Sequence, residues 1–390
     1  MMLKRVFSLC LCFCLVFSVG FAAEESDKKS DAMVNAKSSI LMEQTTGKVL
    51  YESNPDEKMQ IASVTKTMTM LLIMEALADG KIKYTDMVST SDHAASMGGS
   101  QVFLEPGEEM SVDDMLKAIC VSSGNDAAVA MAEHIGGSEE AFVDMMNNRA
   151  KELGAKNTHF INCNGLDETN DHYSTARDVA LISCELLKHE DIQKYTTIWM
   201  DTLRGGKFGL SNTNKLIRFY KGANGIKTGS TSVAKYCLSA SAKRDNMQLV
   251  AVVLCAPSTQ DRFSGASKLL DYGFANYEVA DGAALAGETG KIAVVGGEKD
   301  FASCGAASSG NIVVKKGEAK KIEVKKTMPD EINAPVKKGD KIGELSFILD
   351  GKEIAKKDII ASEDVGKIKL YKMYMKILRK WLLSEQQKKS

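Results

Sequence analysis

The stretch Ile61-Ala62-Ser63-Val64-Thr65-Lys66 opens an apolar run with helical spacing, and it places a serine and a lysine three residues apart at a predicted helix start. The run continues through Met68, Leu71, Leu72, Met74 and Leu77 and ends near Asp79-Gly80. Residues three apart on a helix are neighbours, so we expect the Lys66 amine beside the Ser63 hydroxyl. A serine hydroxyl becomes a nucleophile when an adjacent base accepts its proton. The stretch therefore predicts both a helix and a candidate catalytic pair.

Two later motifs supply polar groups of the same kind. Ser123-Gly124-Asn125 lies on a predicted loop between helices at 112–119 and 125–135, and Lys227-Thr228-Gly229 lies in a predicted strand at 221–231. Lys66 must be neutral to accept a proton, and burial, a nearby positive charge such as Lys227 and the helix N-terminus would all lower its pKa. Each motif alone also fits an ordinary helix cap, turn or strand. Their order, spacing and context together favour a serine acyl-transfer site.

The remaining pattern predicts a mixed α/β body. Besides the segments above, we expect strands at 39–43, 48–51, 236–242 and 247–255 and helices at 139–153, 175–187 and 262–275. Strands at both ends of a helical middle favour an antiparallel sheet covered by helices. Beyond residue 277 the helical periodicity is lost. Short apolar segments at 291–295, 311–314, 321–324 and 342–349 predict a small all-β domain.

The whole chain has 390 residues, with 50 basic and 51 acidic side chains. This balance gives no global basic field, so we expect no nucleic-acid partner. The N-terminus combines Lys4 and Arg5 with an apolar run at 6–21 and small residues before Glu24, which predicts a signal peptide at 1–22 and an exported protein. An uncleaved anchor helix is the alternative. Residues 23–35 are predicted to be a charged tether.

Six of the nine cysteines follow the predicted signal peptide. They form no Cys-x-x-Cys pair and have no histidine cluster near them, so we predict no metal site. Several lie in apolar segments, which favours buried free thiols. Disulfides remain the alternative for an exported protein.

The C-terminal segment 365–390 is predicted to be an amphipathic helix. Between Ile368 and Leu383 the apolar side chains gather on one side and lysine and arginine on the other, with no acidic residue among them. This pattern is typical of a helix lying on an anionic membrane surface. A helix packed against its own protein is the alternative.

Taken together, these motifs resemble the low-molecular-mass penicillin-binding proteins that are D-alanyl-D-alanine carboxypeptidases. The resemblance rests on the three motifs and on Gly165-Leu166, Tyr173-Ser174-Thr175-Ala176 and Gly225-Ile226. It implies a β-lactamase/transpeptidase-like catalytic domain at 36–277, a small β domain at 278–364 and an amphipathic anchor at 365–390. It also implies an exported enzyme on the outer face of the cytoplasmic membrane, without a cofactor, that acts on peptidoglycan stem peptides and is inhibited by β-lactams.

The resemblance also implies roles for individual residues. Ser63 would attack the carbonyl between two D-alanines, Lys66 would be the base and Ser123 would relay the proton to the leaving amine. Asn125 would bond the substrate backbone and the lysine. The terminal carboxylate would lie at Lys227 and Thr228, Gly229 would let the substrate approach the strand, and the N–H groups of Ser63 and Ser230 would form the oxyanion hole.

The chain departs from the family pattern at two positions. Lys235 stands where the family often has glycine, and Ala256-Pro257-Ser258 stands where an arginine often follows the strand, which leaves Arg262 as the nearest cation for a carboxylate. Three alternatives remain: a class A β-lactamase using Glu168, a non-catalytic wall-binding protein and a transpeptidase. The spacing from Glu168 to Asn170 does not fit the expected lactamase pattern.

Overall fold

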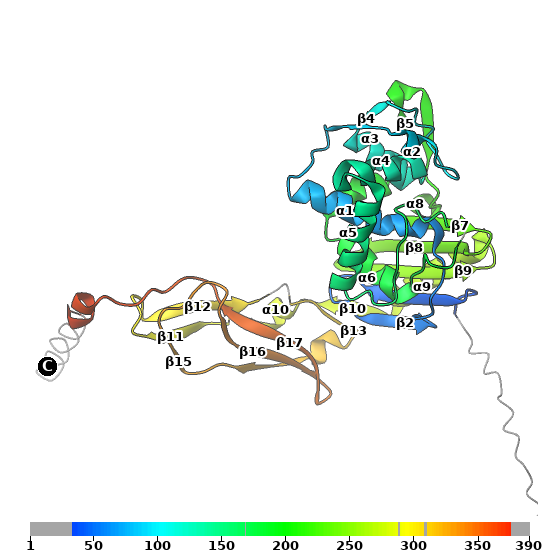
Figure 1. Cartoon of the computed structure of the whole chain (residues 1–390). Helices are drawn as coiled ribbons and strands as arrows, with labels where there is room; N and C mark the ends of the chain where they lie inside the picture. The colour runs from blue at the N-terminus through cyan, green and yellow to red at the C-terminus, as the bar shows by residue number, and fades with distance from the viewer. Residues whose placement is uncertain (1–32, 168, 288, 308–309, 376–390) are drawn as a thin grey trace, which may run out of the picture. The chain divides into compact units, whose positions relative to one another are not determined.

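The structure, a computed structural model, describes residues 33–375 except 168, 288 and 308–309 (Figure 1). The predicted signal peptide and most of the predicted tether therefore lie outside the described residues. So does Glu168. Of the predicted C-terminal helix, residues 370–375 are helical and the remainder lies outside the described part.

A five-stranded antiparallel sheet in the order β2-β1-β9-β8-β7 organises the first part of the chain. Its strands are β1 (Ser38–Glu43), β2 (Val49–Ser53), β7 (Ala223–Thr231), β8 (Lys235–Arg244) and β9 (Met247–Ala256). The central strand β9 is almost wholly apolar because both faces of the sheet are covered. Strand β7, which carries Lys227-Thr228-Gly229, lies at the edge of this sheet.

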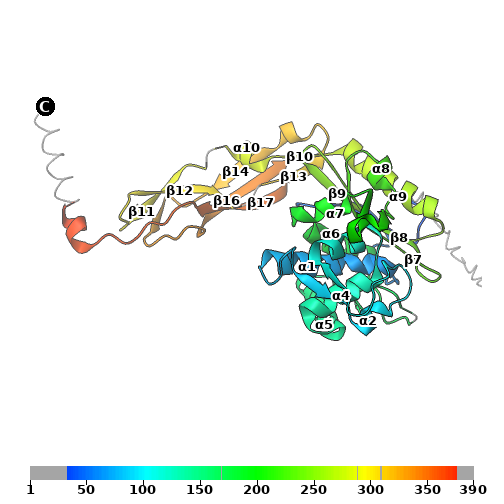
Figure 2. The ribbon, with the colours of Figure 1, turned by 90° about the horizontal axis from the view of Figure 1, so that it is seen from above.

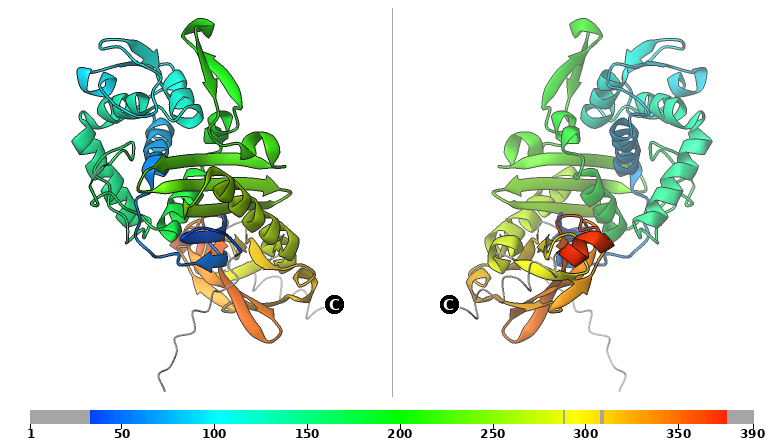
Figure 3. Two further views of the ribbon diagram at one scale, coloured as in Figure 1. Left: turned by 90° about the vertical axis from the view of Figure 1, so that its right-hand side faces the viewer. Right: turned by 90° about the vertical axis from the view of Figure 1, so that its left-hand side faces the viewer.

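Helices cover one face of the sheet, as Figure 3 shows from two sides. The longer ones are α1 (Lys66–Ala78), α3 (Val112–Val121), α4 (Asn125–Gly136), α5 (Glu139–Glu152) and α6 (Ala176–Leu186). Helix α1 is central, with 10 of its 13 residues buried, so it is apolar around most of its circumference. The hydroxyls of Ser111, Ser138 and Thr175 cap α3, α5 and α6 by accepting backbone N–H bonds, which fixes where these helices begin.

Short elements complete this part of the chain. They are α2 (Asp92–Ala95), α7 (Gln193–Thr196), α8 (Leu216–Phe219) and two two-stranded antiparallel sheets, β3 (Met87–Ser89) with β4 (Glu109–Ser111) and β5 (Met200–Leu203) with β6 (Phe208–Ser211). These two short sheets were not predicted from the sequence.

Helix α9 (Thr259–Asn276) packs on the opposite face of the sheet, against β8 and β9. Leu269, Leu270 and Ala266 point into that second core. The helix begins three residues before the predicted start at 262 because the Ser258 hydroxyl accepts the N–H of Asp261.

The C-terminal part has a core of its own, formed by residues between Ala280 and Val365. Its six-stranded sheet has the order β14-β16-β17-β12-β11-β15, and Figure 2 shows β16 and β17 side by side. The strands are β11 (Lys291–Val295), β12 (Phe301–Ala306), β14 (Glu323–Thr327), β15 (Glu331–Asn333), β16 (Lys341–Leu349) and β17 (Lys352–Ala361), with β10 (Tyr277–Ala280) and β13 (Ile312–Lys315) forming a separate pair. The predictions of a mixed α/β body and a following β part are confirmed.

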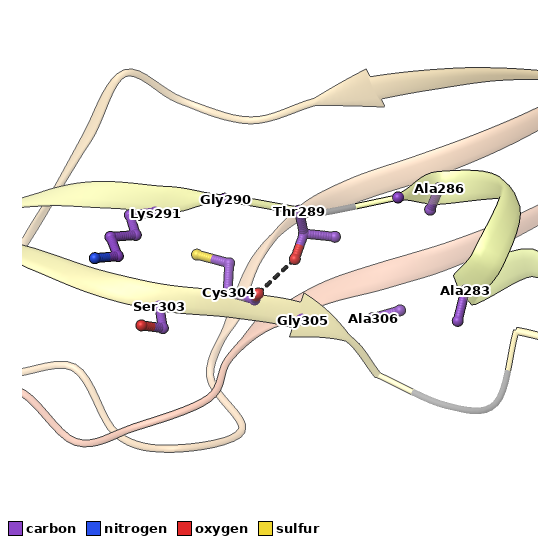
Figure 4. A pocket seen from close by; sticks show the side chains of 10 residues that line it. Ala283, Ala286, Thr289, Gly290, Lys291, Ser303, Cys304, Gly305 and Ala306 are labelled. Carbon is purple, nitrogen blue, oxygen red and sulfur yellow. Dashed lines mark hydrogen bonds between the residues drawn. The ribbon is translucent and has the colours of Figure 1, made fainter.

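A pocket of about 380 Å³ lies in the C-terminal part, between α10 (Gly282–Ala286) and the end of β12 (Figure 4). Thr289 donates its hydroxyl to the carbonyl of Cys304 at one wall, and Lys291 and Ser303 lie farther along. Elsewhere in the described ranges the four cysteines 120, 163, 184 and 237 are buried, and all six cysteines after residue 32 are free.

The residues that the structure describes lack two features. They contain no group of three histidine, cysteine or acidic side chains that could hold a metal ion. Of the helices that the structure describes, none has the length and apolar character needed to span a bilayer.

Candidate active site

Ser63 lies on a single 3₁₀ turn, η1 (Ala62–Thr65), that runs directly into α1. The side chain of Lys66, the first residue of α1, is fully buried and makes three hydrogen bonds. Its Nζ lies 3.0 Å from Ser63 Oγ, 2.5 Å from Asn125 Oδ1 and 2.8 Å from the main-chain oxygen of Asn164. The predicted contact between serine and lysine is therefore present, and Asn164 is a partner that the sequence did not indicate.

The three partners orient the Lys66 amine. A neutral amine has two N–H bonds and one lone pair, and the oxygens of Asn125 and Asn164 can only accept. The two N–H bonds therefore point to these oxygens, and the lone pair faces the Ser63 hydroxyl, the one partner that can donate. Burial lowers the pKa of Lys66 to about 7, against the opposing effects of Cys163 and Asp126. Burial, rather than a neighbouring cation, is thus the main cause of the shift.

The second motif reaches this centre through Asn125. Asn125 is the first residue of α4, not a loop residue as predicted, and its amide nitrogen donates to the oxygen of Gly98 at 2.7 Å. This bond fixes the amide so that Oδ1 faces Lys66. Ser123 is buried and has a φ of 65° in the left-handed region. Within the described part of the chain, the Ser123 hydroxyl makes no hydrogen bond to Ser63, Lys66 or Lys227. Its predicted role as a proton relay is therefore not supported by a hydrogen bond.

The third motif lies directly against the serine turn. A Cβ on Gly229 would lie 2.7 Å from the oxygen of Ile61 and 2.9 Å from the nitrogens of Ser63 and Val64, so glycine is required for this approach. Lys227 is buried. Burial is the main cause, and the charge of Lys66 the second cause, that its pKa lies well below the ordinary value. Its Nζ donates to the oxygen of Thr228 at 2.8 Å.

Thr213 is a further residue of the site that the sequence did not reveal. The Thr228 hydroxyl donates to Thr213 Oγ1 at 2.7 Å, and Thr213 itself is exposed. The two flanking asparagines are buried and hold this turn in place. Asn214 donates to the oxygen of Gly225 at 2.9 Å, and Asn212 donates to the oxygen of Ile198 at 2.6 Å. A second hydroxyl is therefore positioned beside Thr228.

The two departures from the family pattern have clear structural settings. Arg262 on α9 is buried, and its Nη1 donates to the main-chain oxygens of Gly229 at 3.2 Å and Cys237 at 3.4 Å, so it links β7 and β8. Lys235 begins β8 with a φ of 53°, a conformation that favours glycine. The hairpin thus keeps a glycine-like turn while it carries an exposed cation.

Ser230 follows Gly229 and is exposed at the sheet edge. Because β7 is the last strand of its sheet and Ser230 is exposed, the strand edge at Ser230 can pair with an extended peptide. The arrangement therefore combines an oriented base, a serine and an open strand edge, which suits acyl transfer from a peptide.

Comparison with known proteins agrees with this arrangement. Residues 24–258 match the family model described as D-alanyl-D-alanine carboxypeptidase, and residues 279–367 match the model described as penicillin-binding protein 5, C-terminal domain. The chain is 50% identical over 352 residues to D-alanyl-D-alanine carboxypeptidase DacF of Bacillus subtilis, covering 89% of this chain and 90% of the relative. It is 37% identical over 353 residues to DacC of Escherichia coli, covering 88% and 87%.

A solved structure gives the same result. Penicillin-binding protein 5 from Haemophilus influenzae superposes with a TM-score of 0.74 at 34% identity, covering 86% of this chain and 98% of that one. Both parts of the fold are therefore shared with known proteins. The chain belongs to the D-alanyl-D-alanine carboxypeptidase family of serine peptidases, the penicillin-binding hydrolases of the cell wall.

Proposed function

We propose that this protein removes the terminal D-alanine from peptidoglycan stem peptides through an acyl-enzyme on Ser63. The observation that carries the proposal is the oriented amine of Lys66, 3.0 Å from Ser63 Oγ. Lys66 accepts the hydroxyl proton as Oγ attacks the carbonyl carbon between the two D-alanines. The amine of the departing D-alanine takes a proton, with Ser123 as the proposed relay. Water then attacks the ester, and Ser63 recovers its proton as the shortened peptide leaves.

The remaining proposed residues bind and polarise the substrate. Lys227 and Thr228 would take the terminal carboxylate, and Asn125 would bond the substrate backbone. The N–H groups of Ser63 and Ser230 would stabilise the oxyanion, and Gly229 leaves room for the peptide at the strand. The contact between Gly229 and the Ser63 turn supports this assignment, because it brings β7 within bonding range of an acyl group on Ser63.

The test is release of D-alanine from a diacyl-Lys-D-Ala-D-Ala peptide by the protein without residues 1–22, with Ser63→Ala as the matched control. We expect release and covalent labelling by a fluorescent penicillin in the wild type, and neither in the variant. Release by Ser63→Ala would refute the mechanism. Rapid hydrolysis of a β-lactam without D-alanine release would instead indicate a β-lactamase, and inertness in both assays would indicate a wall-binding protein.

We further propose that the protein is exported and is held on an anionic membrane surface by residues 365–390, with the catalytic domain at 36–277 and the β domain at 278–364. The charge pattern between Ile368 and Leu383 supports this proposal. Deletion of residues 367–390 should abolish sedimentation with vesicles that contain anionic lipid while leaving D-alanine release unchanged. Equal sedimentation of the deleted and complete proteins would contradict the anchor.

A further inference from the structure

A histidine outside all three motifs is buried behind the catalytic lysine. His172 is 1% exposed, and both of its ring nitrogens have partners. Nε2 lies 2.7 Å from the hydroxyl oxygen of Thr65, the residue that precedes Lys66. Nδ1 lies 3.3 Å from the main-chain nitrogen of Ile161. The ring thus connects the turn that carries Ser63 with the loop 160–166.

The partners determine which nitrogen carries the proton. The N–H of Ile161 can only donate, so Nδ1 accepts, and the proton of the neutral ring lies on Nε2. His172 therefore donates to Thr65 Oγ1 while it accepts from Ile161. A neutral ring that donates from Nε2 and accepts at Nδ1 satisfies both partners. A ring protonated at both nitrogens could not accept the N–H of Ile161.

The backbone of His172 is fixed independently of its ring. Its neighbour Tyr173 exchanges two main-chain hydrogen bonds with His159, at 2.9 and 3.0 Å. Ser174 exchanges two with Met59, at 2.8 and 3.0 Å, on the chain leading into the serine turn. The ring therefore starts from a defined position between the two segments, and a change of side chain should leave this backbone in place.

The loop that His172 holds contributes directly to the active site. It carries Asn164, whose oxygen accepts a hydrogen bond from Lys66. Its next residue, Gly165, has a φ of 83°, and a Cβ there would lie 2.0 Å from the oxygen of Ala62 and 2.6 Å from Thr65 Oγ1. The loop and the serine turn are in direct contact at Thr65, where the His172 bond is made. Small shifts there would move one acceptor of the Lys66 amine.

We propose that His172 is a positioning residue for acyl transfer, which sets the alignment of the Lys66 lone pair by tying the Ser63 turn at Thr65 to the loop that presents the Asn164 carbonyl. The inference rests on the proposed function of Ser63 and Lys66 and adds a residue that touches neither substrate nor the reacting atoms. Because misplacement of a catalytic group by about 1 Å costs about 100-fold in rate, a side chain at this distance can control turnover.

The electrostatic surroundings keep the ring neutral at working pH. Burial lowers the pKa of His172 to about 4, with smaller lowering effects from His159 and Lys66 and an opposing effect from Asp167. Protonation below that value would remove the acceptor for Ile161 and place a second charge near Lys66. The alignment is therefore stable across the range in which Lys66 titrates.

Two substitutions test the two hydrogen bonds of the His172 ring separately. His172→Gln places an amide donor where Nε2 lies and keeps the bond to Thr65, whereas His172→Asn keeps only an acceptor for Ile161. The rate constant for acylation by a fluorescent penicillin would be measured from pH 5 to 9 on the full chain, with melting temperatures recorded alongside. We expect His172→Gln within about 3-fold of the wild type and His172→Asn slower by about 10-fold or more. The acid inflection of His172→Asn should also move by at least about half a pH unit.

Thr65→Val removes the same bond from its other end. It should slow acylation as much as His172→Asn does, and the double variant should be no slower than either single variant. A merely structural role would lower the melting temperature and leave the rate and inflection of the folded protein unchanged. Wild-type rates and inflections in His172→Asn and Thr65→Val would overturn the inference about His172 and leave the proposed function of Ser63 and Lys66 unaffected. Labelling that persists in Ser63→Ala would overturn the proposed function and the inference with it.

Discussion

The clearest prediction concerns the pH dependence of acylation, because the structure gives Lys66 a pKa of about 7. Only the neutral amine can accept the Ser63 proton, so the rate should follow the neutral fraction. With a pKa of about 7 that fraction rises from about 9% at pH 6 to about 91% at pH 8, which is about a 10-fold gain that levels off. An amine with the ordinary pKa of 10.5 would give about a 100-fold gain over the same interval and no plateau.

The assay is the second-order rate constant for acylation by a penicillin whose own groups do not titrate between pH 6 and 9. Stopped-flow or quenched-gel fluorescence would follow the acyl-enzyme, and circular dichroism at each pH would establish that the protein stays folded. A rate that is flat from pH 6 to 9 would refute the role of Lys66 as a base with a pKa of about 7. A 100-fold rise without a plateau would refute the argument that burial lowers its pKa.

Three further outcomes follow from the geometry. Gly229→Ala should lower the rate constant for acylation by at least about 100-fold with an unchanged circular dichroism spectrum, because the added Cβ would meet backbone atoms of the serine turn. A near-normal rate constant would contradict that contact. Thr213→Val should raise the KM for a D-Ala-D-Ala peptide by about 5-fold with kcat unchanged, because loss of one hydrogen bond costs about 1 kcal/mol. Thr213→Ser keeps the hydroxyl and should restore the KM. An unchanged KM in Thr213→Val would exclude Thr213 from substrate binding. With residues 1–22 removed, Ellman's reagent should titrate the half-buried Cys255 and Cys304 in the native protein and the four buried thiols only after unfolding; six fast thiols would contradict the packing.

The sequence predicted well those parts of the fold that depend on local periodicity. The apolar run after Ser63 predicted α1, and the paired apolar segments predicted β8 and β9 to within two residues at each end. Strand β17 was missed because its segment, Lys352–Ala361, has lysines and acids among its apolar residues, a pattern also typical of loops. Its place in the sheet comes from pairing with β16 and β12, which is not a local property.

The limits of sequence reasoning at the site have the same origin. The contact between Ser63 and Lys66 was predictable because the two residues are one helical turn apart. Asn164 meets Lys66 across 98 residues and His172 meets Thr65 across 107, and no spacing rule links such positions. Thr213 lies in an Asn-Thr-Asn turn whose pattern indicates a turn but not the neighbouring strand.

The orientation of the Lys66 amine has a consequence for the order of events in each catalytic cycle. With both N–H bonds directed to fixed carbonyls, the amine can exchange a proton in one direction only, toward Ser63 Oγ. If Lys66 is also the base for hydrolysis, the attacking water has to reach it from the side of Ser63 Oγ, since the lone pair faces that side. On the proposed mechanism, formation and hydrolysis of the acyl-enzyme would both use this one lone pair, and the water could take its place beside the amine only after the D-alanine has left.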